Sequence, residues 1–82
     1  MRRLPSASGA DVIRLLSSLG YQVVRQRGSH ARLRADVAHG EHNITVPMHK
    51  DVAKGTLNDI LSSVSSQTGA PKEELISRLA HK

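Results

Sequence analysis

The stretch YQVVRQRGSHARLRA, residues 21–35, decides the fold of this chain. Its first part, 21–26, is rich in residues that favour strands, and its last part, 30–35, alternates polar and apolar residues. The tripeptide Arg27-Gly28-Ser29 separates the two parts. A short connection that contains glycine is typical of a β-hairpin, so the two parts are predicted to pair as antiparallel strands.

The alternation also assigns two faces to the second strand, because successive side chains of a strand point to opposite sides. The apolar members are predicted to face a core: Ala31, Leu33 and Ala35. The polar members then face the other way: His30, Arg32 and Arg34. The register of the first strand is open, since Val23 and Val24 are neighbours and must point to opposite sides.

Helical spacing of apolar residues flanks the hairpin on both sides. A helix is predicted from Gly9 to Leu19, beginning at Ser8 and Asp11, which stand three apart as in a capping box. A second helix is predicted around Leu57, Ile60, Leu61 and Val64. A short third helix is predicted over 71–80, where PKEELISRLA begins with a proline.

Between the hairpin and the second helix, DVAHGEH at 36–42 predicts a turn and NITVP at 43–47 predicts a third strand. The fold class is therefore α+β: a three-stranded antiparallel sheet with helices packed on one face, in the order α-β-β-β-α plus a short C-terminal helix. We expect one domain over 1–82, with 1–7 as a flexible tail and 70–82 as a helical extension that packs against the core.

The composition favours a polyanionic partner. The 82 residues carry a formal charge of +5, and only one of them is aromatic. There is no cysteine and no apolar run of the roughly 20 residues that span a bilayer, so a soluble, cytoplasmic protein without membrane contact is predicted. Pro5, Asp11 and Arg14 interrupt the apolar segment that a signal peptide would need.

Metal and cofactor sites are disfavoured. His39 and His42 have a spacing that zinc can use, but they lie in a predicted turn with no cysteine nearby. Neither a Walker loop nor a dinucleotide-binding motif is present, so no metal and no small-molecule cofactor is expected. A serine triad is also disfavoured, because Ser29 and His30 are neighbours in a strand and face opposite sides.

Metal-independent RNA cleavage needs only a group that transfers protons and groups that stabilise negative charge on the phosphate. The stretch RQRGSHARLR at 25–34 contains both kinds of residue. A histidine can move protons near neutral pH, and arginines can stabilise the extra charge on a five-coordinate phosphorus. Gly28 would allow the backbone to approach a phosphate closely. The alternative interpretation is a solvated, basic strand face that discourages aggregation.

The order and spacing of several motifs resemble the HicA toxin family, messenger-RNA interferases of bacterial and archaeal toxin–antitoxin pairs. The resemblance covers residues 11 to about 64, in DVIRLLSSLGYQVVRQRGSHARL and ITVPMHKDVAKGTLNDIL. It implies a fold like the double-stranded RNA-binding domain, a metal-independent endoribonuclease that cleaves messenger RNA, and a HicB-like antitoxin as protein partner. Many members carry a histidine or bulky residue where this chain has Ala31.

The resemblance implies that His30, in the Gly-Ser-His motif, is the catalytic acid/base. His49 matches the Val-Pro-x-His element, either as a second acid/base or phosphate ligand or as a loop residue that positions the second helix. Together with the charge pattern, the family resemblance predicts these RNA-binding residues: Arg25, Arg27, Gly28, Ser29, Arg32, Arg34, His49, Lys50 and Lys54.

Two other functions are compatible with the sequence. The chain could be a non-catalytic RNA-binding module, because double-stranded RNA is recognised by shape and phosphate contacts that a basic surface supplies. It could also be a protein-interaction module whose basic face meets an acidic partner. The scarcity of aromatic residues argues against base stacking on single strands.

Overall fold

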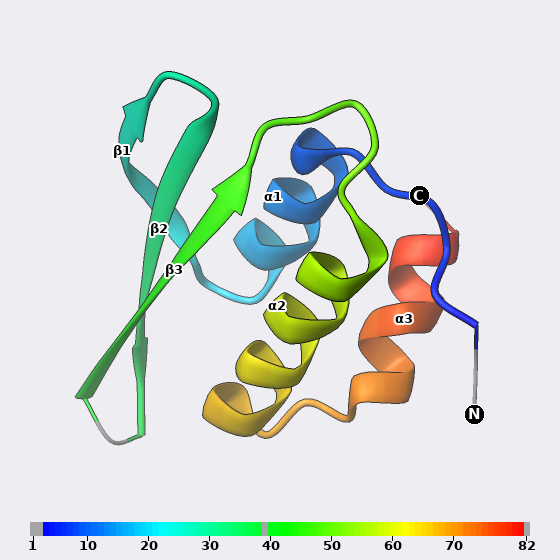
Figure 1. Ribbon diagram of the computed structural model, residues 1–82. Helices are drawn as coiled ribbons and strands as arrows, with labels where there is room; N and C mark the ends of the chain where they lie inside the picture. Colours follow the sequence, from blue (N-terminus) through cyan, green and yellow to red (C-terminus); the bar gives the residue numbers. More distant parts are fainter. Residues whose placement is uncertain (1–2, 39, 82) are drawn as a thin grey trace.

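The computed structural model describes residues 3–38 and 40–81. Figure 1 shows the order α-β-β-β-α-α, which confirms the predicted one. The elements are α1 (Gly9–Ser18), β1 (Gln22–Arg27), β2 (His30–Val37), β3 (Gly40–Pro47), α2 (Lys54–Thr68) and α3 (Lys72–Ala80). Helix α1 begins at the predicted capping box, in which the Ser8 side chain accepts from the Asp11 N–H and the Asp11 carboxylate accepts from the Ser8 N–H.

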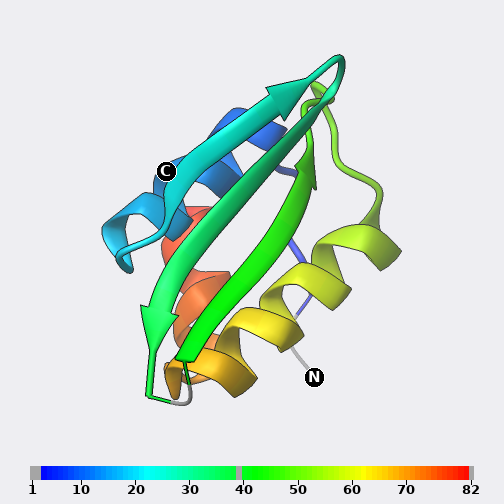
Figure 2. The same ribbon diagram turned by 90° about the vertical axis from the view of Figure 1, so that its left-hand side faces the viewer.

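The three strands form one antiparallel sheet in the order β1-β2-β3. All three helices lie on one side of this sheet in Figure 1, and Figure 2 shows the opposite face without a covering helix. The predicted α+β class, with helices packed on one face of the sheet, is therefore confirmed.

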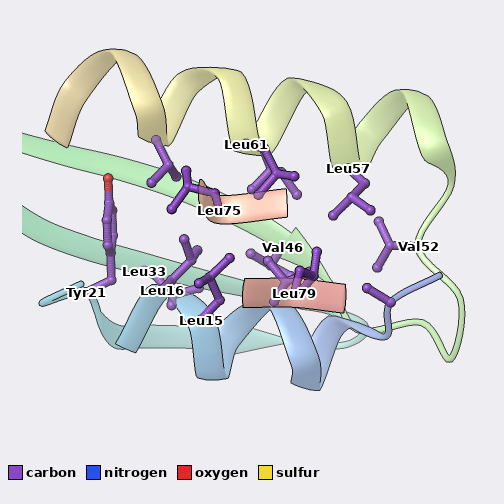
Figure 3. Close-up of a cluster of buried hydrophobic side chains, with 14 of the residues drawn as sticks. Leu15, Leu16, Tyr21, Leu33, Val46, Val52, Leu57, Leu61, Leu75 and Leu79 are labelled. Carbon is purple, nitrogen blue, oxygen red and sulfur yellow. The ribbon is translucent and has the colours of Figure 1, made fainter. Parts of the chain in front are cut away.

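The core lies between the sheet and the helices, as Figure 3 shows. The predicted core face of β2 is confirmed, since Ala31, Leu33 and Ala35 are all buried. The helices contribute their predicted apolar stripes: Leu57, Ile60, Leu61 and Val64 from α2, and Leu75, Ile76 and Leu79 from α3. These side chains belong to one cluster, so α3 is part of the same core as the sheet and the other helices.

The predicted turn over 36–42 is wrong in extent. Strand β2 continues to Val37 and β3 begins at Gly40, so Asp36 pairs with Glu41 and Ala35 pairs with His42. Polar residues such as Asp36 and Glu41 resemble a turn in the sequence, but on the open face of a sheet they need no apolar partner. Backbone pairing therefore extends through them.

Part of the segment 1–7, which the sequence predicts as a flexible tail, packs against the core. Ala7 is buried in the core, and Leu4 packs against the same cluster. The Val52 N–H donates to the Ala7 carbonyl at 2.8 Å, which ties this segment to the loop before α2. The apolar side chains of Leu4 and Ala7 have a surface to bury against, and the sequence does not reveal that surface because it comes from distant elements.

Candidate nucleic-acid interface

The uncovered face of the sheet carries the predicted polar residues of β2. His30, Arg32 and Arg34 are exposed, and they alternate with the buried residues of the strand. Ala31 is completely buried. It stands where many members of the family that this sequence resembles have a histidine or bulky residue. The small side chain at this position therefore affects packing beneath the sheet and leaves the open face unchanged.

A β-bulge in β1 decides which side chains join His30. Val23 pairs with Leu33, but the next pair along the ladder is Arg25 with Arg32, so Val24 is an extra residue. Directly opposite residues of antiparallel strands project from the same side of the sheet. The bulge thus brings Arg25 onto the same face as Arg32.

The same shift places Arg27 directly opposite His30. In a regular ladder continuing from Val23, Gln26 would stand there instead. The four residues Arg25, Arg27, His30 and Arg32 are all exposed, and we call them the basic hairpin face. The described structure contains no carboxylate within 4 Å of these three arginines, since its ion pairs involve only Arg14 and Arg34.

Gly28 and Ser29 form the two-residue connection between β1 and β2. Gly28 has φ of 56°, in the left-handed region that favours glycine, and no atom lies within 4 Å of the position a Cβ would occupy. The requirement for glycine is therefore conformational. A glycine at the first loop position suits a tight hairpin turn whose twist matches the strands, which keeps Arg27 opposite His30.

The loop after β3 meets this turn. The Met48 N–H donates to the Ser29 carbonyl at 2.6 Å, and the His49 carbonyl accepts from the Gly9 N–H at 2.9 Å. The Gly-Ser-His and Val-Pro-x-His motifs, separated in the sequence by the rest of β2 and β3, therefore meet at one end of the sheet. His49 and Lys50 are both exposed in this loop, which continues from the hairpin turn towards the N-terminus of α1.

The open face is electrostatically polarised along β2. Arg34 lies 3.5 Å from the Glu41 carboxylate, and Asp36 pairs with Glu41 across β2 and β3. An exposed ion pair of this kind contributes about 0–1 kcal/mol to stability, but it offsets the charge that Arg34 offers to a polyanion. The end of β2 with Asp36 is acidic and the end with His30 is basic. A phosphate backbone is therefore attracted to the end that carries His30, next to the turn at Gly28 and Ser29.

The structure does not bring Lys54 to the basic hairpin face. Lys54 is the first residue of α2, and its Nζ donates to the Leu4 carbonyl at 3.2 Å. The α2 helix packs on the covered side of the sheet, so Lys54 belongs to a different surface from His30. The structure places six of the predicted RNA-binding residues in the β1–β2 hairpin: Arg25, Arg27, Gly28, Ser29, Arg32 and Arg34. His49 and Lys50 lie in the loop that meets the hairpin turn, and Lys54 is separate from both groups.

His42 takes part in a polar network that the sequence did not indicate. Its Nδ1 lies 2.6 Å from the Tyr21 hydroxyl, and its Nε2 lies 3.0 Å from the Ser63 hydroxyl. Both contacts are satisfied when the phenol donates to Nδ1 and the Nε2–H donates to Ser63. Burial raises the pKa of Tyr21 and so keeps the phenol protonated, while burial lowers the pKa of His42 from its usual 6.5.

The sequence placed His42 only in a disfavoured zinc site with His39. His39 lies outside the described residues, and within the described ranges no group of three metal-binding side chains is found. The alternation of β3 was the available signal, because His42 stands opposite Ala35 and so on the helix-facing side. A polar residue on that side needs partners, and Tyr21 and Ser63 supply them.

We expect stability to fall with acidification through His42. Its folded-state pKa lies below 6.5, so its contribution is fully present above 6.5 and is lost as the pH falls from there towards the lower folded value. Thermal melts across this range measure the effect, and His42→Gln is the control because glutamine does not titrate. A profile for His42→Gln as steep as that of the parent would contradict this assignment.

Further findings come from the helices and from comparison with known proteins. Across the described helices, none is long and apolar enough to cross a membrane. Comparison with curated proteins and with solved structures gives no match. Residues 9–65, from α1 through most of α2, match the sequence model of the HicA toxin of bacterial toxin–antitoxin systems. The match spans more than half of the 82 residues and includes both motifs that meet at the end of the sheet, so this chain belongs to the HicA toxin family.

Proposed function

We propose that this chain is the toxin of a toxin–antitoxin pair and acts as a metal-independent endoribonuclease on messenger RNA, with His30 as its acid/base. Membership of the HicA toxin family makes it a toxin of such a pair. The observation that supports the enzymatic part is the pairing of Arg27 with His30 and of Arg25 with Arg32 on the open face. Messenger RNA as substrate implies action in the cytoplasm.

The proposed reaction uses a nucleophile that the RNA itself carries. The 2′-oxygen attacks the adjacent phosphorus, the bond from phosphorus to the 5′-oxygen breaks, and a 2′,3′-cyclic phosphate and a 5′-hydroxyl result. One proton leaves the 2′-hydroxyl and one reaches the 5′-oxygen. His30 transfers one of these protons, and we propose His49 for the other, because the Met48 N–H of its loop donates to the carbonyl of Ser29, which precedes His30.

The arginines of the basic hairpin face would stabilise the transition state. The five-coordinate phosphorus carries more negative charge than the starting phosphodiester, and guanidinium groups stabilise this charge through bidentate, charged hydrogen bonds. Arg27 is the closest to His30 along the ladder, and Arg25 and Arg32 continue the positive surface along the sheet. We therefore assign the scissile phosphate to Arg27 and neighbouring phosphates to Arg25 and Arg32.

The direct test is cleavage of a defined single-stranded RNA by the purified protein in excess EDTA. We expect cleavage with 2′,3′-cyclic phosphate ends, and no cleavage of a DNA strand of the same base sequence, because DNA lacks the 2′-hydroxyl. Binding of the RNA without cleavage would instead support the non-catalytic RNA-binding module. Cleavage of both strands at equal rates would contradict the proposed nucleophile.

The salt dependence of RNA binding measures which arginines contact phosphates. Replacing Arg25 and Arg32 by glutamine should reduce the slope of log affinity against log salt by about 1.4, at about 0.7 per phosphate contact on a single strand. Arg34→Gln is the matched control, because Glu41 already offsets the charge of Arg34. If Arg34→Gln lowers the slope by about 0.7, as the loss of one phosphate contact would, the RNA runs along the whole strand.

A HicB-type antitoxin is the partner that the family implies. We propose that it binds the basic hairpin face through acidic residues and so excludes RNA, because one surface cannot hold both. Val24 is 50% exposed and precedes Arg25 at the bulge, which supports a protein contact there, since apolar side chains gain from being covered. Competition between the antitoxin and RNA for the purified toxin tests this assignment.

A further inference from the structure

A groove of about 780 Å³ lies between the N-terminal segment, α2 and α3. Figure 1 shows this segment beside α3, on the side of the helices that faces away from the sheet. Its lining includes three basic residues, Arg3, Lys54 and Lys72, and the apolar side chains of Leu4 and Ile76. The proposed reaction uses none of this surface, because Lys54, the one predicted RNA-binding residue here, lies on a different surface from His30.

The positive charge of this groove is not cancelled by its lysine contacts. Lys54 Nζ donates to the Leu4 carbonyl at 3.2 Å, and Lys72 Nζ donates to the Asn58 amide oxygen at 2.6 Å. Both acceptors are neutral, so the bonds hold the two ammonium groups at the groove and leave their charge in place. Among the described residues of the lining, Glu73 is acidic and three residues are basic.

The floor of the groove is apolar. Ile76 is almost fully buried, at 4% exposure, and Leu4 is partly buried against the core. Ile76 exposes almost no surface, so a ligand that fills the groove would cover the exposed part of Leu4 and meet the cations beside it. This pattern of an apolar centre and a charged rim is typical of a protein-binding surface.

Two of the three walls lie outside the residues that match the HicA family. The match covers 9–65, whereas Arg3 and Leu4 precede it and Lys72 and Ile76 follow it. The groove is thus built by adding an N-terminal segment and α3 to the matched part of the fold. A contact made here would depend on features of this chain that the family match does not include.

We propose that this groove binds an acidic, amphipathic peptide segment of a partner protein. An aliphatic side chain of the segment would cover the exposed part of Leu4, and carboxylates would meet Arg3, Lys54 and Lys72. RNA fits less well, because phosphates would leave the aliphatic floor uncovered. Base stacking has no platform here, since the single aromatic residue of the chain, Tyr21, is buried in the core.

The test is a selection from a random peptide library displayed on phage, with the full chain as the target. We expect the enriched peptides to combine acidic and aliphatic residues. Their affinity, measured on synthetic copies by fluorescence anisotropy, should fall roughly tenfold or more for Lys54→Glu/Lys72→Glu, because two attractive contacts become repulsive. Lys50→Glu is the matched control for Lys54→Glu alone, since each reverses one charge, but Lys50 lies in the loop outside the groove and its change should leave peptide affinity unchanged.

Circular dichroism melts check that each variant folds, and Lys54→Gln/Lys72→Gln replaces the charge reversal if the latter does not. Enriched peptides that lack acidic residues, or that bind the groove variants as tightly as the parent, would overturn the proposal. So would a larger loss of RNA affinity than of peptide affinity in these variants, which would assign the groove to RNA. Failure of RNA cleavage by the parent would bear only on the proposed nuclease, because peptide binding is measured without RNA.

Discussion

A His30→Ala variant is expected to lose RNA cleavage by about 10²- to 10⁴-fold, the usual contribution of a positioned acid/base. The fold should survive, because His30 is exposed on the open face and its truncation leaves no cavity in the core. Most exposed substitutions change stability by no more than about 0.5 kcal/mol. RNA affinity should largely survive as well, since Arg25, Arg27 and Arg32 remain.

The measurement combines the cleavage rate of a defined RNA, its dissociation constant and the thermal melt of each protein. His81→Ala is the matched control, because His81 is an exposed histidine beyond the end of α3, remote in the fold from the hairpin. It should cleave at the parental rate. A His30→Ala protein that cleaves as fast as the parent would remove His30 from the reaction, and one that no longer folds would show that its role is structural.

A Leu33→Ala variant is expected to lose about 2–5 kcal/mol of folding free energy. Leu33 is completely buried at the centre of β2, beneath the helices in Figure 3, so the truncation removes apolar contacts and leaves a cavity. A domain of 82 residues has a total stability of about 4–12 kcal/mol at the usual values per residue. The loss is therefore a large fraction of the total stability, and the variant should unfold at a markedly lower urea concentration and temperature.

Urea denaturation of both proteins measures this loss as a shift in midpoint at constant slope. Val24→Ala is the control, since it also shortens an apolar side chain in the sheet, but at a position that is 50% exposed. It should change stability far less than Leu33→Ala. Equal losses in the two variants would show that the sheet is not packed as described.

Sequence periodicity predicted most of the fold because it is a local property. In β2 and α2, the spacing of apolar residues within the element is enough to predict which side is buried. It failed where polarity alone was the signal, at 36–42, because polar residues suit both turns and the open face of a sheet. It gave no indication that Leu4 and Ala7 pack against the core, because an isolated apolar residue does not reveal the distant surface that it covers.

The residues of the site were likewise predicted where the signal was local and missed where it depended on distant parts of the chain. Sequence motifs indicated His30 and the surrounding arginines, and the open face of β2 confirmed that His30, Arg32 and Arg34 lie side by side. The partners of His42 could not be predicted, because Tyr21, His42 and Ser63 come from three separate elements. The basic groove could not be predicted for the same reason, because its lining combines residues of the N-terminal segment, α2 and α3.

By itself, the sequence determined the order of the elements, the core face of β2 and the family to which the chain belongs. Only the tertiary structure decided which arginines join His30, through the extra residue at Val24. An exposed edge strand such as β1 has no buried side to mark its register, so a one-residue bulge leaves no periodic trace in the sequence. Pairing with β2 sets that register, and it brings Arg25 and Arg27 to the open face.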